Sequence, residues 1–573
     1  MESESDARGG GALSANAKKL CELYNSLEAK RQPWVCLWQD IATYIVPRKY
    51  PGLNGTVSSP GTENESRLFD ITAIRAHQIN ANGCLAWMTP GESTWFSYAP
   101  PATEKDESVK MWLSKASQAT REALSQSNFY LAVHEFYLDR SAFGTAALFC
   151  EPGDDEAVTF QCWGCGTFVI NTDHRDKVTT VIRKFTLTAE QAAEKFGEEN
   201  LSAKILKAYN MGGSAAQQEF EFLHFVMPRK KQDRQGTIKQ QMPIACYYIE
   251  KDAQRLVMED GYSEMPVLVS RYLEWGTGTG GMYGWSPAFS ALPEARQVNF
   301  LQKMMDAFAE KCVFPPWLVP EDMEKEVDPN AAAVNYFSKD LQAHQMPREM
   351  PIVGKYDIGK DRVIERQNAI KEAFQVDMFQ MFASMEKQHE MTAREVMERS
   401  QEKLVQFSPT FQRITTELCN PLIRWLFDTL MMQGAFGPVE EIPGALIRQV
   451  PGGLYVATPQ VQYSSRIALA LKQQPTIGFW RTLELATAIA TAKGDPSVFD
   501  CLDVDAAVVS DAISNGVDAD IIVPMNKRRA IRDARAKAMQ QQEEMQQMAM
   551  GAEAAGKLGT IKSDSMIGKA VAA

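Results

Sequence analysis

The sequence predicts an α+β fold that is mainly helical. Helical periodicity opens the chain over residues 16–46, short β-branched and aromatic runs replace it between 145 and 272, and helical periodicity returns beyond residue 284. The chain has 573 residues, of which 45% are hydrophobic and 23% charged. That length suffices for roughly three to five units with sizeable cores, and that composition is typical of a folded globular protein.

The first 284 residues are expected to form a helical part followed by a mixed β part. Residues 1–15 are acidic and glycine-rich, so we expect them to be disordered and to contain no secretory signal. Leucine and tryptophan recur at three and four residues over 16–46, and Pro47 ends that helix. Further helices are predicted at 71–87 and 112–143.

The β part is predicted from short apolar runs that are separated by turn signals. Strands are expected at 167–170, 178–182, 220–226 and 244–249, with one helix at 189–209. The basic stretch 228–239 is predicted to form an exposed hairpin loop.

Two long helices that bracket a proline-rich insert follow. Ser286 and Pro287 form a helix start, and the helix must end before Pro315. Six of the 48 residues in 313–360 are proline (12.5%), against 28 of 573 in the chain (4.9%), so no long helix is expected there. A second helix runs over about 361–388. Two such helices are expected to stand antiparallel as a stalk that holds the insert, and their apolar face requires partners.

Helical patterns continue toward the C-terminus. Thr392 and Glu395 form a capping box, and a helix that starts at Ser408 has leucine or isoleucine at every fourth position until Gly434. Residues 467–492 and 506–515 are also helical patterns. Residues 526–550 are predicted to be a helix with a basic start, and the segment 551–573 to be disordered.

No motif in the sequence meets the requirements of a catalytic or cofactor site. We therefore expect that the protein is not an enzyme and that it binds no cofactor and no metal. Gly276–Gly281 fits GxGxxG, but no helix opens at its third glycine. Cys162 and Cys165 have CxxC spacing without a second pair of zinc ligands, which favours structural thiols. Asp503 and Asp505 are more typical of a helix start than of a cation site. The net charge of −12 argues against tight binding of nucleic acid by the chain as a whole.

The order and spacing of short motifs over about residues 17 to 540 resemble the portal (head-to-tail connector) proteins of short-tailed bacteriophages, the podovirus type. The motifs are Arg31-x-x-Trp34, Phe69-Asp70-Ile71-Thr72-Ala73, Trp87-Met88-Thr89-Pro90, Gly144-Thr145-Ala146-Ala147-Leu148, Tyr283-Gly284-Trp285-Ser286-Pro287-Ala288, Met391-Thr392-Ala393-Arg394-Glu395-Val396, Asn420-Pro421-Leu422-Ile423 and Leu502-Asp503-Val504-Asp505.

The resemblance implies a ring, with twelve subunits in the family, at one vertex of the capsid. It divides the chain into a wing (16–284 and 391–436), a first stem helix (285–312), a clip (313–360), a second stem helix (361–386), a tunnel loop (387–390), a crown (437–524) and a C-terminal helix (525–550) that extends the crown like a barrel.

The function that the resemblance implies is a non-enzymatic channel for genome packaging and ejection, which also nucleates head assembly. Implied partners are double-stranded DNA, the terminase large subunit, a tail adaptor, and coat and scaffolding proteins, with no membrane. The protein would be made in the host bacterial cytoplasm and end in the virion. DNA contact is expected from the tunnel loop and docking of partners from the clip, at these positions: Lys387, Gln388, His389, Glu390, Trp317, Leu318, Tyr336 and Phe337.

Two alternatives from other classes stay open. A tail adaptor or collar ring protein would join only assembled heads, whereas a portal assembles together with coat and scaffolding proteins. A nucleotide-binding enzyme that uses Gly276–Gly281 would bind ATP or NAD.

Overall fold

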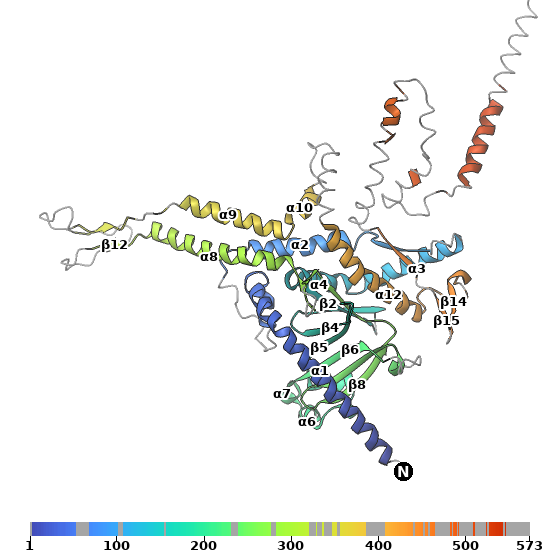
Figure 1. Cartoon of the computed structure of the whole chain (residues 1–573), viewed down its shortest axis with the longest axis horizontal. Helices are drawn as coiled ribbons and strands as arrows, with labels where there is room; N and C mark the ends of the chain where they lie inside the picture. The colour runs from blue at the N-terminus through green and yellow to red at the C-terminus, as the bar shows by residue number, and fades with distance from the viewer. Residues whose placement is uncertain are drawn as a thin grey trace, which may run out of the picture. The chain divides into compact units, whose positions relative to one another are not determined.

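The structure is a computed structural model with helices and strands in mixed order (Figure 1). It describes residues 3–52, 68–100, 107–153, 156–230, 239–276, 282–319, 328, 335–336, 346–351, 354, 356–384, 407–438, 440, 442–450, 453–456, 459–464, 482–483, 485–489, 491, 508–509, 523, 527–542 and 545. The chain divides into two compact units, Met1–Ala468 and Leu469–Ala573.

The helices of the first unit bear out most of the predicted helical segments, with shifted ends. Their bounds are α1 (Ser3–Tyr44), α2 (Thr72–Met88), α3 (Glu107–Gln126), α4 (Phe129–Phe143), α5 (Ala189–Phe196), α6 (Ala203–Met211), α7 (Gly213–Ala216), α8 (Pro287–Val313), α9 (Tyr356–Ala373), α10 (Val376–Ser384) and α12 (Asn420–Met432). Residues 407–414 are also helical and continue through one π-helical turn, η7 (Thr415–Cys419), into α12. None of the helices within the described residues is both long and apolar enough to span a lipid bilayer.

Several predicted helix boundaries were wrong. α1 reaches back into residues 3–15, which we expected to be disordered, because a helix adds one hydrogen bond per residue once its buried part has formed. The expected helix at 112–143 is two helices, and the one at 189–209 breaks after α5 at Gly197, whose φ of +77° is left-handed. The second stalk helix begins at Tyr356, inside the expected insert, and is interrupted at residues 374–375.

Two antiparallel sheets form the β part. A five-stranded sheet has the order β4 (Phe168–Thr172), β5 (Val178–Thr188), β6 (Glu219–Pro228), β7 (Ile244–Glu250), β8 (Arg255–Tyr262), and a three-stranded sheet has the order β3 (Val158–Trp163), β2 (Thr145–Pro152), β9 (Val267–Arg271). The four predicted strands are confirmed as β4 to β7. Sequence inspection did not resolve β2, β3 and β8.

The five-stranded sheet is covered on both faces, which explains its nearly continuous apolar strands. On β6, Phe222 belongs to the core beneath α5 and α6, whereas its neighbour Leu223 belongs to the core beneath the N-terminal half of α1. Successive side chains of a strand point to opposite faces, so the two neighbours serve two different cores. Arg31 fastens α1 to the sheet by donating to the carbonyls of Gly166 (2.6 Å) and Phe168 (2.8 Å).

Four short pairings complete the strands of the described residues. β10 (Leu273–Glu274) pairs with β11 (Gly284–Trp285), β12 (Trp317–Leu318) with β13 (Arg348–Glu349), β14 (Ile447–Val450) with β15 (Gly453–Val456), and β1 (Phe96–Ala99) with β16 (Gln460–Tyr463). The β1–β16 pair joins segments more than 350 residues apart in sequence, so the chain after Gly434 returns to its own N-terminal part.

Candidate functional site

The most distinctive structure in the first unit is an arm made of α8 and α9. The two helices lie side by side and lead from the sheets to the β12–β13 ribbon (Figure 1). Early α8 faces late α9, since Glu294 pairs with Arg366 at 2.6 Å, and late α8 faces early α9, since the rings of Phe308 and Tyr356 stack at 6.4 Å. The helices are therefore antiparallel, as predicted, and α8 is about 40 Å long.

The base of the arm is held by buried apolar residues and polar ties. Val298 and Val363 belong to the main core. Gln367 donates to Asp70 (2.7 Å), and the amide of Phe69 donates to Asn299 (2.6 Å), so the segment before α2 contacts both arm helices. The base is thus part of the folded body.

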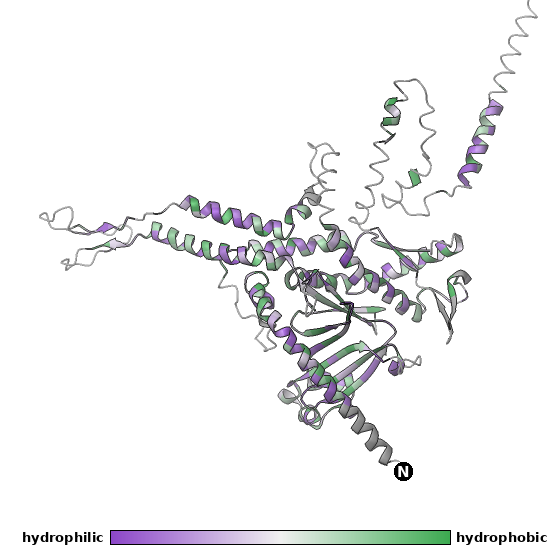
Figure 2. Cartoon of the chain, in the orientation of Figure 1, coloured by the Kyte–Doolittle hydropathy of each residue, from purple (hydrophilic) through white to green (hydrophobic). Residues whose placement is uncertain are grey.

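α8 carries two apolar faces, and the described chain covers one of them. Met305 faces α9, where a Cβ added at Gly359 would contact it, and Phe308 faces Gly354, just before α9. Phe300 and Met304, one turn apart on another face, are 58% and 45% exposed. Figure 2 shows hydrophobic residues continuing along α8. The exposed large hydrophobic side chains of the arm helices and the adjoining Phe314 are Phe300, Met304, Val313, Phe314, Tyr356, Ile358 and Ile364. Among them, Phe300 and Met304 are neighbours on one face of α8, and contiguous exposed apolar surface of this kind is typical of sites that bind another protein.

The charges of the arm cancel. α8 has three acidic and three basic residues, and α9 has four of each. The arm therefore presents neither a basic surface that would hold phosphates tightly nor a strongly acidic one.

The far end of the arm contains the predicted docking residues. Trp317 and Leu318 form β12 and are half-exposed, paired with Glu349 and Arg348 across the ribbon. Tyr336 is 83% exposed. The structure thus brings Trp317 and Leu318 together on one strand. Phe337 lies outside the described residues, as do Lys387, Gln388, His389 and Glu390.

A joint separates α9 from α10. Gln375, between the helices, has a φ of +56°, which a residue with a side chain rarely adopts. Asn80 on α2 donates to the carbonyl of Phe374 at 2.8 Å, and the His77 ring meets the Phe374 ring edge-on at 6.0 Å. On α10, the Phe379 ring lies edge-on to Phe407 at 5.9 Å. The joint is therefore held by α2 on one side and by the helix 407–414 on the other.

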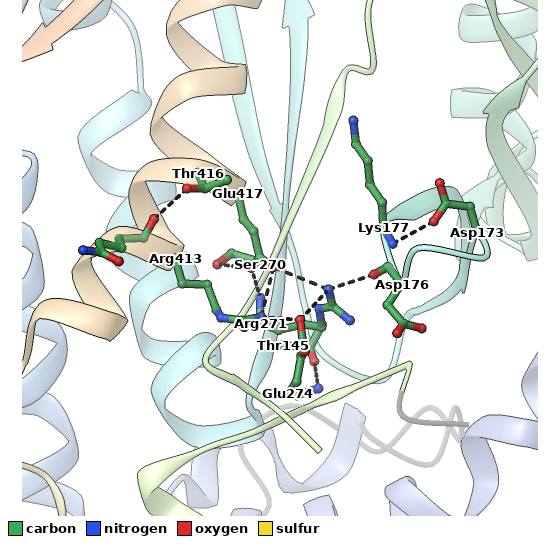
Figure 3. A network of polar contacts seen from close by, with 12 residues as sticks. Thr145, Asp173, Asp176, Lys177, Ser270, Arg271, Glu274, Arg413, Thr416 and Glu417 are labelled. Atoms are coloured by element: carbon green, nitrogen blue, oxygen red, sulfur yellow. Dashed lines mark hydrogen bonds and ion pairs between the residues drawn. The ribbon is translucent and has the colours of Figure 1, made fainter. Parts of the chain in front are cut away.

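Glu417 is the centre of a polar network between the three-stranded sheet and the helices after residue 407 (Figure 3). Its carboxylate accepts from the backbone amide of Arg271 (2.7 Å) and from the hydroxyl of Ser270 (3.1 Å). The guanidinium groups of Arg271 and Arg413 lie at 3.5 and 3.3 Å from its other oxygen. The network fastens the returning helices to β9.

The same network extends to the turn between β4 and β5. Arg271 is buried and donates to the carbonyl of Asp176 at 2.9 Å. Arg140 on α4, also buried, donates to the Ser270 hydroxyl (3.1 Å) and to the Arg271 carbonyl (3.2 Å). The sequence did not predict the pairing of Glu417 with Arg271, because partners 146 residues apart leave no local pattern.

Comparison with known proteins identifies the family of the chain. Residues 17–523 match the family described as bacteriophage head to tail connecting protein. The chain belongs to this family. It is 27% identical over 569 residues to the "Probable portal protein" of Bordetella phage BPP-1, covering 96% of each chain. It is 26% identical over 547 residues to the portal protein of Salmonella phage epsilon15, covering 94% of this chain and 93% of that one.

Membership in the head-to-tail connecting protein family indicates a structural protein, and the glycine motif has a structural place. β10 and β11 pair antiparallel on either side of Gly276, whose φ is +75°. A dinucleotide site requires a parallel strand–turn–helix unit instead. The third glycine of the motif lies outside the described residues.

The CxxC pair of this connector protein also sits in a structural setting. Burial raises the pKa of both Cys162 and Cys165, which makes the reactive thiolate scarce. The Cys165 amide donates to the buried carboxylate of Asp139, which pairs with Lys49. Within the described residues, no three His, Cys, Asp or Glu side chains gather where a metal ion could bind.

Proposed function

We propose that this connector protein is a portal protein, a subunit of a ring at one vertex of a phage capsid through which DNA is packaged and ejected. The observation that carries the proposal is the antiparallel arm, which is fastened at its base and exposes a second apolar face along α8. Family membership and the names of both relatives support it. A second copy of the chain is the partner that would cover this face, as in other cyclic assemblies.

In this proposal the arm is the stem and the β12–β13 segment is the clip. The stem comprises α8 and α9, and the clip lies between Phe314 and Lys355. The body before Trp285 and the helices 407–432 form the wing, the chain beyond residue 437 forms the crown, and α10 leads into the tunnel loop. Trp317, Leu318 and Tyr336 would then face the terminase large subunit during packaging and the tail adaptor afterwards.

The charge of the chain suits DNA that passes without being held. Twelve copies at −12 each give a ring of −144, which would repel a duplex whose backbone carries one negative charge about every 1.7 Å of its axis. The neutral arm would line part of the channel without binding phosphates tightly.

The test is whether the apolar face of α8 makes the ring. We expect the purified full chain to form rings that electron microscopy and mass photometry detect. Phe300→Glu together with Met304→Glu should abolish them, because charges would be buried between subunits. Met211→Glu, at an exposed methionine on α6, is the control and should leave the rings intact.

Two results would contradict the proposal. A chain that stays monomeric at all protein and salt concentrations is one. Rings that join only preassembled heads, and never form together with coat and scaffolding proteins, are the other; they would favour a tail adaptor or collar protein.

A further inference from the structure

The second unit contains a helix whose charge is opposite to that of the chain. Residues 527–542 are helical, and all of them except the half-buried Arg528 are exposed. Between Lys527 and Lys537 there are six basic residues and one acidic residue, Asp533, a net charge of +5. The whole chain has −12, and α8 and α9 are each neutral. Figure 2 shows hydrophilic residues along much of this helix.

The arginines of this helix share one side. At 100° per residue, Arg528, Arg529, Arg532 and Arg535 fall within an arc of about 120°, while Ala530 and Ala534 fall on the opposite side. Arg529, Arg532 and Arg535 follow one another at three-residue steps along about 9 Å of the axis. The Arg528 side chain donates to the carbonyl of Val523 at 2.8 Å, which ties the start of the helix to the preceding chain.

We propose that this arginine face binds the phosphodiester backbone of duplex DNA. The guanidinium group is a planar, permanently charged donor whose geometry matches a phosphate, and a row of exposed arginines with one nearby acid is complementary to a polyanion. The inference rests on the proposed function, which brings duplex DNA to this protein. This contact would differ from the one expected at the tunnel loop. The arginine face would hold DNA electrostatically, whereas the tunnel loop would let DNA pass.

The experiment measures binding of a mixed-sequence 30-base-pair duplex to the full chain over a range of salt concentrations. Arg529, Arg532 and Arg535 are replaced together by Gln, which is also a good helix former, so that circular dichroism should be unchanged. If each arginine neutralises one phosphate, the slope of log Kobs against log salt should become less steep by about 2.7 for each bound subunit. Replacing the same residues by Lys should retain most of the slope.

The matched control replaces Lys18, Lys19 and Lys30, three exposed lysines on α1, by Gln. This variant has the same net charge as the arginine variant and should bind as the unaltered chain does. A second duplex of unrelated sequence should give the same affinity, because phosphate contacts carry no sequence information.

Ring formation is measured separately, so the two proposals fail separately. A less steep dependence of log Kobs on log salt in the arginine variant, but not in the lysine control, supports this inference whether or not the chain forms rings. An unaltered chain that does not bind the duplex would overturn it. Equal binding by the arginine variant and the unaltered chain would also overturn it, as would an equal loss in the lysine control. If the arginine variant loses its rings but keeps its DNA affinity, the face binds another protein subunit and the inference is wrong.

Discussion

The side chain of Asn80 donates a 2.8 Å hydrogen bond to the backbone carbonyl of Phe374, across 294 positions of the sequence. This carbonyl belongs to the residue that directly follows α9, at a helix end where backbone acceptors lack partners within the helix. α2 thereby caps the second arm helix from outside, at the point where the chain changes direction into α10. In a portal, this is where the stem would meet the tunnel loop.

Replacing Gln375 by Gly should stabilise the joint. Gln375 has a left-handed φ of +56°, which costs roughly 1 kcal/mol for a residue with a Cβ, and its buried Oε1 has no hydrogen-bond partner among the described residues. Part of the gain is offset because Gly has more conformational freedom in the unfolded chain. We expect a net increase of about 0.5–1 kcal/mol in the free energy of unfolding by chemical denaturation. A decrease would show that the side chain makes a stabilising contact.

Replacing Gly83 by Ala should loosen α10. A Cβ at Gly83 would lie 2.2 Å from the Phe379 ring, so the ring or the helix must move. Overpacking of this kind costs about 1–3 kcal/mol. Phe379→Ala alone should also destabilise, because it leaves a cavity, yet the double variant should lose less than the sum of the two. Additive losses in the denaturation experiment would mean that the two positions do not contact each other.

Removal of the Glu417 carboxylate should weaken the attachment of helices 407–432 to the sheet. Glu417→Gln leaves the buried Arg271 without its nearest carboxylate, which is only 19% exposed, at a cost of about 2–4 kcal/mol. Glu417→Ala should cost more because it also removes the acceptors. Arg413→Gln, at a more exposed partner, should cost no more than about 1 kcal/mol. Limited proteolysis should then cut between residues 385 and 432 fastest in Glu417→Ala. Equal effects for Glu417→Ala and Arg413→Gln would contradict this order.

Acid should destabilise the protein through His77. Burial lowers the pKa of His77 to about 4, and its Nε2–H donates to the Leu138 carbonyl at 2.8 Å. The unfolded chain takes up a proton near pH 6.5, whereas the folded chain does not until about pH 4. The stability is therefore complete above pH 6.5 and decreases by about 3 kcal/mol as the pH falls to 4. His77→Gln should remove this part of the pH dependence; an unchanged profile in the variant would assign it to other groups.

Local signals predicted the parts of the fold that local physics controls. The five leucine and isoleucine residues spaced by four from Ile414 to Leu430 are all buried, and α12 ends two residues before Gly434, whose φ is +73°. The helix start at Pro287 is confirmed too. Its cap is not local, however, since the hydroxyl of Ser286 donates to the Ala142 carbonyl at 2.6 Å and makes no bond to its own helix.

The same distinction applies to the candidate site. Proline content and helix periodicity predicted an antiparallel stalk with a head, and Trp317 and Leu318 lie at that head. The break at Gln375 was not predicted, because nothing near it in sequence disfavours a helix; the cap on Phe374 comes from α2. Glu417 was missed for the same reason, since its partners belong to a distant strand.

The sequence by itself determined most of the described helices of the first unit, the strands β4 to β7, and the two long helices that flank a proline-rich insert, because apolar periodicity, proline and glycine act within a few residues. Only the tertiary structure decided where α9 breaks, which carboxylate joins the buried arginines, and which face of α8 the described residues leave uncovered. Those features depend on partners that lie far apart in the chain and meet only when it folds.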